Sequence, residues 1–298
     1  MRVANKVIFD SITVNLRRAS EGLSKANTVV SSAKKINQLS DDPVGLVTVL
    51  DLRSSLAGVE QVGRNIQMGR SWLESSESAL TQTENLLSEI KSLGVQMASA
   101  TQGSSQRAGA AAIVDGQMRQ LMALANTEVG GRYIFAGTMT DTTPFAFDDE
   151  SNPTAVSYSG NQTAFSVRIG KDMTVEVGED GEDVFGASGS GIFDTLLSLK
   201  GYLQNNDVAG IQASLTALDD HLEDIGAVIS EVGAKTLRLD SKQEILEGMK
   251  LTYTDRKSMI EDADIAEAIM DLKAKELAYQ AALSSSTKVM AMSLVDYL

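Results

Sequence analysis

The chain has 298 residues, no cysteine, a single histidine and a net charge of −14 at pH 7. The missing cysteines exclude disulfides, thiolate metal sites and cysteine nucleophiles, and one histidine argues against Ser-His-Asp triads and most histidine-based metal sites. The acidic balance argues against a general nucleic-acid binder, which needs a basic surface. We therefore expect no catalysis, no cofactor, no metal site and no nucleic-acid partner.

The charge is spread unevenly along the chain. Residues 1–40 are mildly basic, whereas residues 141–190 are strongly acidic and should be well solvated. We find no run long and apolar enough to cross a membrane, and the first twenty residues lack the apolar core of a secretory signal. We expect no membrane insertion, and composition alone would suit a cytoplasmic protein.

The N-terminal segment, from about residue 5 to 35, carries the most regular heptad pattern in the chain. Apolar or small residues follow one another at steps of three and four, namely Phe9, Ile12, Leu16, Ala19, Leu23, Ala26, Val30 and Ala33. Burying a leucine contributes roughly 1.5–3 kcal/mol and burying an alanine much less. This helix should therefore form only a weak coiled coil by itself.

A helix-breaking run, Ser40-Asp41-Asp42-Pro43, follows this segment. Pro43 disfavours helix at Asp42 but suits the first turn of a following helix. Either Asp41 or Asp42 can accept the free N–H groups at the start of that helix. We interpret the run as a structural turn and cap rather than as a binding site.

Long proline-free helices are predicted on both sides of a central segment. One runs from about Val44 to Ala100, and another from about Asp207 to Met259; shorter helices are expected over 106–126 and from Ile192 onward. Short period-2 pieces between glycine-containing turns predict a small β insert. These pieces are Arg132–Gly137, Ala155–Tyr158, Phe165–Ile169 and Met173–Val177.

Three features of the middle of the chain have a plain structural interpretation. The acidic runs at 148–150 and 179–183 match no EF-hand spacing, so we interpret them as solvated hairpin tips rather than calcium sites. His221 lies in a strongly acidic helical stretch, and we expect it on the surface.

The C-terminal segment, residues 262–298, contains neither proline nor glycine, and Asp264 can cap its helix. One seam comprises Ile265, Ile269, Leu272, Glu276, Tyr279, Leu283, Ser286, Met290, Ser293 and Tyr297. A second apolar row comprises Ala266, Met270, Leu277, Ala281, Val289, Leu294 and Leu298. The combined face is wider than a two-helix seam needs. The segment either docks in a core of its own chain or contacts other subunits, and the weak alanine-rich heptad favours the second alternative.

These patterns predict a mainly α fold with a small β insert. The N- and C-terminal arms should form a long antiparallel helical bundle or coiled coil, and the middle of the chain should form a central β-rich domain. We expect five segments: an assembly helix and turn (1–43), the two halves of a helical rod (44–129 and 192–260), the insert (130–191) and a C-terminal assembly helix (261–298).

Several motifs in this layout resemble the flagellin family, and within it the hook–filament junction subunits. They are Met1–Val3, Lys35–Pro43, Asn126–Gly137, Glu231–Lys235 and Glu261–Ala266 with the tail that follows. Two departures stand out: Ser31-Ser32-Ala33 replaces the glycine that the family often has before Lys35, and the opening lacks the Ile-Asn-Thr-Asn run of filament flagellins. The second departure and the short insert favour a junction subunit over a filament flagellin.

The resemblance implies a structural protein, not an enzyme. Such subunits are exported through the flagellar type III channel without a cleaved signal peptide and assemble outside the cell, where they join hook to filament as an adaptor ring. The implied partners are further copies of the chain, the first hook-associated protein, filament flagellin or the cap side, and an export chaperone. The expected assembly interface is Phe9, Ile12, Leu16, Leu23, Val30, Ile265, Ile269, Leu272, Tyr279, Leu283, Met290, Leu294 and Leu298.

Two alternatives remain open at this point. Within the same family, the chain could be a filament flagellin. From a different class, it could be a cytoplasmic coiled-coil scaffold or signalling protein, although a β insert between mirrored helical arms argues against that.

Overall fold

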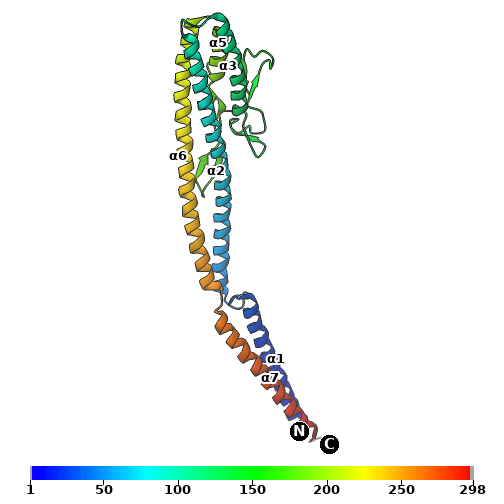
Figure 1. The fold of residues 1–298 in the computed structure, drawn as a ribbon. Coiled ribbons are helices and arrows are strands. Elements are labelled where there is room, and N and C mark those ends of the chain that lie inside the picture. Colours follow the sequence, from blue (N-terminus) through cyan, green and yellow to red (C-terminus); the bar gives the residue numbers. More distant parts are fainter. Residues whose placement is uncertain (1, 296–298) are drawn as a thin grey trace. The chain divides into compact units, whose positions relative to one another are not determined.

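The computed structural model describes residues 2–295, and within them the side chains of residues 6–288 except that of Ile8 (Figure 1). The chain forms two compact units, Met1–Val59 with Gly248–Leu298, and Glu60–Glu247. Two long helices, α2 (Pro43–Ala98) and α6 (Val208–Glu261), belong partly to each unit. Long helices with three small antiparallel strand pairs confirm the predicted mainly α fold.

The first unit pairs α1 (Arg2–Ser32) with α7 (Ile265–Val295), which lie side by side in opposite directions (Figure 1). Gly22 of α1 lies against the aliphatic chain of Lys275 in α7. About one turn further along α1, Ala26 is buried, and so is Ala268 of α7. Such small residues let two helices approach closely.

The second unit is built on an antiparallel pair of helices, α2 and α6. Two ion pairs fix their register, one between Arg70 and Asp240 (3.3 Å) and one between Lys91 and Asp219. Every seventh residue of α6 is buried over this stretch, namely Ile211, Leu218, Ile225, Val232, Leu239 and Leu246. On α2 the same spacing buries Ile66, Leu73, Leu80 and Leu87. A strict seven-residue repeat is typical of a left-handed coiled coil.

Two shorter helices, α3 (Ser104–Ala125) and α5 (Ile192–Gln204), pack against each other in this unit. Lys200 of α5 binds Asp115 of α3 at 2.7 Å. The buried guanidinium of Arg107 donates to the carbonyl oxygens of Met97 (2.8 Å) and Ser99 (2.9 Å). Arg107 therefore satisfies the free carbonyls at the end of α2.

The insert contains three strand pairs and a short helix, α4 (Gly181–Phe185). The pairs are β1 (Glu128–Val129) with β2 (Arg132–Tyr133), β3 (Phe145–Phe147) with β4 (Val156–Tyr158), and β5 (Ser166–Arg168) with β6 (Thr174–Glu176). The predicted strand over Arg132–Gly137 is wrong beyond Tyr133, because β2 ends there and the backbone turns, with the amide of Met139 donating to the carbonyl of Ala136 (3.2 Å). Ile134, Phe135 and Ala136 are all fully buried.

The insert docks on the coiled coil of its own unit. Gly69 of α2 leaves so little room that a side-chain Cβ there would stand 3.1 Å from Val177. Trp72 packs against Phe165, with ring centroids 5.1 Å apart. Lys235 of α6 binds Glu179 at 2.9 Å. The insert is therefore part of the second unit's core.

His221 is less exposed than predicted. It is half-buried, and its Nε2 lies 3.0 Å from Oγ1 of Thr195 in α5. The sequence shows only the acidic neighbours on its own helix, whereas the covering helix comes from a different part of the chain. Burial lowers the pKa of His221, although Asp224 and Asp220 oppose this effect.

This burial predicts a pH-dependent stability. The unfolded histidine, with a pKa of about 6.5, takes up a proton more readily than the folded one, so the stability it contributes is complete above that pH and is lost as the pH falls. We expect urea unfolding to show a smaller stability loss between pH 7 and pH 5 in His221→Gln than in the unchanged chain. Equal losses in the two proteins would contradict the assignment.

Candidate assembly surface

A backbone strap joins the loop after α1 to the loop before α7. The amide of Lys35 donates to the carbonyl of Glu261 (2.8 Å), and the amide of Ala263 donates to the carbonyl of Ala33 (3.0 Å). Ala33 reaches this position through a left-handed backbone, with φ of 58°. It therefore does what the glycine of the family would do, at a higher conformational cost.

The carboxylate of Glu261 lies at the centre of this strap. Its side chain is only 3% exposed and binds Nζ of Lys34 at 2.7 Å and Nη2 of Arg53 at 2.5 Å. Burial by itself would raise the pKa of Glu261, but Lys34 and Arg53 together hold it below its ordinary value. Sequence patterns missed this cluster because Lys34, Arg53 and Glu261 lie far apart along the chain. The adjacent lysines Lys34 and Lys35 before the turn were the one local feature that could have indicated it.

The aspartates of the predicted turn hold different parts of it. Oδ1 of Asp42 accepts hydrogen bonds from the amides of Val44 (3.1 Å) and Gly45 (2.9 Å) and so caps α2, which begins at Pro43. Asp41 accepts from two amides of the turn, while Lys25 of α1 binds its other oxygen at 2.8 Å. Ser40 is exposed. The turn is thereby fastened to both helices that it connects.

Asp264 caps the following helix in the same way. Its Oδ1 accepts from the amides of Ala266 (2.8 Å) and Glu267 (3.3 Å). The start of α7 is therefore fixed by both the strap and its own cap.

The predicted seam residues divide between the α1–α7 contact and the exposed surface. Half-buried between the helices are Ile12, Leu16, Leu23, Val30, Leu272 and Tyr279. Exposed to a larger degree are Phe9 (53%), Ile265 (41%), Ile269 (45%) and Leu283 (40%). The side chains of Met290, Ser293 and Leu294, together with residues Tyr297 and Leu298, lie outside the part that the structure describes.

The register of the α7 seam differs from the prediction by one residue near its start. Ala268, not Ile269, is the residue buried at this level. Ile269 is 45% exposed, and its role in assembly stays a prediction.

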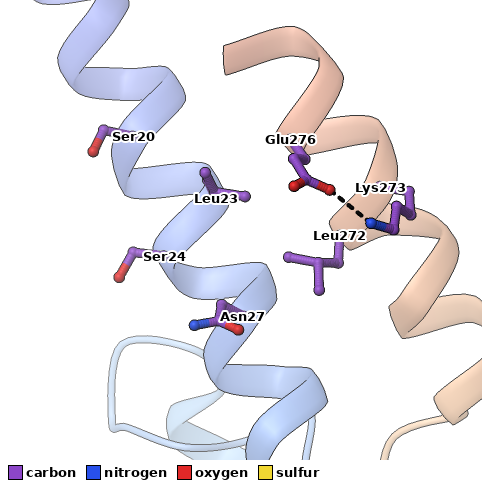
Figure 2. Close-up of a pocket in the computed structure, with 7 residues that line it drawn as sticks. All are labelled: Ser20, Leu23, Ser24, Asn27, Leu272, Lys273 and Glu276. Carbon is purple, nitrogen blue, oxygen red and sulfur yellow. Dashed lines mark hydrogen bonds and ion pairs between the residues drawn. The ribbon is translucent and has the colours of Figure 1, made fainter. Parts of the chain in front are cut away.

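The α1–α7 seam is incompletely filled along its middle. Leu23 and Leu272 line an open groove of about 490 Å³. Figure 2 shows these two side chains pointing toward one another from α1 and α7. The wall of this groove on α7 includes Lys273 and Glu276, which form an ion pair of 2.9 Å. The wall on α1 consists of Ser20, Ser24 and Asn27. Two leucines that a complete helical bundle would bury are thus left half-exposed.

A second apolar row lies on the other side of α7. Met270 is 66% exposed and Leu277 is 70% exposed, one heptad apart. At 100° per residue they point away from the face that carries Ala268, Leu272 and Tyr279. We call this pair the outer row. A helix that is apolar on opposite faces requires partners on both.

Other kinds of site find no support among the described residues. Across residues 2–295 no group of three or more acidic or histidine side chains could hold a metal ion. In the same range no helix has the length and hydropathy of a membrane span. Asp148, in one of the acidic tips, accepts from Thr154 and Ala155, and these bonds lower its pKa and hold the β3–β4 turn.

The fold therefore defines a structural subunit with two strapped terminal helices and unfilled apolar surface. The profile of the bacterial flagellin N-terminal helical region matches residues 5–140, and that of the C-terminal helical region matches residues 215–298. The chain belongs to the flagellin family. Members of this family are flagellar structural proteins, and this chain is not an enzyme.

The individual relatives include both junction and filament proteins. Flagellar hook-associated protein 3 of Salmonella typhimurium is 23% identical, over 99% of this chain and 98% of its own. A flagellin of Bacillus subtilis is 25% identical over 90% of each chain. The solved structure of the flagellar junction protein FlgL of Legionella pneumophila has 16% identity and a TM-score of 0.57, covering 74% of this chain and 100% of that one. This structural likeness confirms the fold.

Because Ala33 adopts a positive φ, replacing it with glycine should stabilise the protein locally rather than destabilise it. Ala33→Gly should stabilise the strap by about 1 kcal/mol, since glycine adopts positive φ without the penalty of a Cβ. Hydrogen exchange of the amides of Lys35 and Ala263 measures this local stability. The matched control is Ala57→Gly, at an exposed helical position of α2, where glycine should lower the stability of the helix by about 1 kcal/mol. Faster exchange in Ala33→Gly would contradict the assigned strain.

Proposed function

We propose that this protein is the adaptor subunit that joins the flagellar hook to the filament and that it assembles into a ring through its terminal helices. The observation that carries the proposal is α7, which is apolar both toward α1 and along the outer row. Within the described residues α1 is the helix that packs along α7, and we infer that a further copy of the chain covers the outer row. The nearly full-length match to hook-associated protein 3 supports the position at the junction.

The runner-up is a filament flagellin, because flagellins match with similar identity. The opening of the chain, which lacks the Ile-Asn-Thr-Asn run of filament flagellins, favours the junction subunit. The third alternative, a cytoplasmic scaffold, conflicts with membership of the flagellin family.

The proposed partners follow from the position at the junction. They are neighbouring copies of the chain, the first hook-associated protein on the hook side, filament flagellin or the cap on the other side, and an export chaperone before assembly. The subunit would act outside the cell after export without a cleaved signal peptide. Within it, segments 1–43 and 261–298 would form the assembly part, 44–129 and 192–260 the rod, and 130–191 the insert.

Deleting the gene distinguishes the junction subunit from its alternatives. We expect a deletion strain to form hooks while filament flagellin spills into the medium as monomers, because filament subunits lose their attachment site. Electron microscopy of the cells and blotting of the medium measure both. Loss of filaments without spilled flagellin would indicate the filament subunit itself, and normal motile filaments would contradict any role at the junction.

The outer row gives a residue-level prediction. Leu277→Glu should weaken self-association and leave the monomer folded, because Leu277 is 70% exposed. Losing the burial of a leucine and placing a charge in the interface should weaken association by at least about tenfold. Sedimentation velocity measures association and circular dichroism measures the fold.

The matched control is Leu237→Glu. Leu237 is 71% exposed on α6 in the second unit, so it has the same chemistry and exposure outside the proposed surface. This control should associate like the unchanged chain. Equal association of the two variants would refute the outer row as an assembly contact.

A further inference from the structure

We propose that Met270 is an oxidation site and that its conversion to methionine sulfoxide by a peroxide blocks assembly of the subunit. The inference rests on the proposed function, since it concerns the outer row of α7. It identifies a chemical modification to which that surface is exposed before assembly.

The side chains available to an oxidant are few in kind. The chain has no cysteine, and its one tryptophan, Trp72, is only 4% exposed. A two-electron oxidant that meets the folded monomer therefore reacts chiefly with exposed methionine thioethers. Exposure separates the methionines sharply: Met118 is completely buried, whereas Met270 is 66% exposed.

Met270 differs from the other exposed methionines by its place in the fold. Met68, Met139 and Met173 belong to the second unit, and Met259 lies near the end of α6. Among the methionines whose side chains the structure describes, Met270 alone is in the outer row. The same exposure that leaves its sulfur open to peroxide leaves its apolar surface available to a partner.

The reaction changes the character of this surface. The sulfur lone pair attacks one peroxide oxygen, an S–O bond forms and the O–O bond breaks. The sulfur loses two electrons, and the second oxygen leaves as water with both peroxide protons. A flexible apolar side chain becomes a polar sulfoxide. Burying it against an apolar neighbour then leaves the sulfoxide oxygen without its hydrogen bonds to water.

The test uses the full chain with Met290→Leu and Met292→Leu, so that these two thioethers do not react. One variant keeps Met270, and the other carries Met270→Leu in addition, which preserves the apolar surface without the sulfur. Both are treated with hydrogen peroxide, and peptide mass spectrometry measures sulfoxide at each methionine. Circular dichroism and unreacted Met118 report that the fold is intact. Sedimentation velocity then measures self-association.

We expect peroxide to weaken association of the protein with Met270 by about tenfold or more and to leave Met270→Leu unchanged. Met259→Leu should not protect self-association from peroxide. Met270→Gln, which places a polar side chain in the outer row, should associate poorly even without peroxide. An equal loss of association in both proteins, or full association of the protein that carries Met270 sulfoxide, would overturn this inference and leave the proposed function standing. Failure of the untreated proteins to associate overturns the proposed function together with it.

Discussion

The terminal helix α7 carries apolar side chains that the described part of the chain leaves uncovered. Its inner face meets α1 along a seam that leaves Leu23 and Leu272 half-exposed, and its outer row, Met270 and Leu277, faces the opposite way. Exposed apolar side chains gathered on one helix indicate an interaction site. In the proposed assembly the inner and outer faces differ, so a copy that covers one face of a neighbour leaves its own other face open. Contacts of this kind build rings or tubes rather than closed dimers.

The two units differ in how completely their helices are packed. In the second unit, the seven-residue rows of α2 and α6 are buried completely, and the insert closes over them through Gly69 and Trp72. The first unit has an alanine-rich seam and depends on its polar connection, in which Glu261 binds Lys34 and Arg53. That connection fixes where α7 starts while leaving most of its surface free.

Periodicity and capping residues predicted most of the fold. The heptads gave the helical arms, and Asp42 and Asp264 marked the helix starts, since both signals depend on neighbours within a few residues. What sequence patterns could not supply were contacts between distant segments. The burial of His221 depends on Thr195 of α5, and the strap depends on the pairing of Ala33 with Ala263. For the candidate surface, the sequence pattern identified the apolar rows. Only the structure shows which of these rows meets α1.

Amide hydrogen exchange in the free and assembled subunit tests the central claim most directly. The account predicts that amides of 265–288 exchange much faster than those of 66–97 in the dilute monomer, because one weak seam holds α7. On assembly, protection over 265–288 should rise strongly while protection over 66–97 stays the same. If α7 were already as protected in the monomer as α2, its surface would be satisfied within one chain and the account would be contradicted.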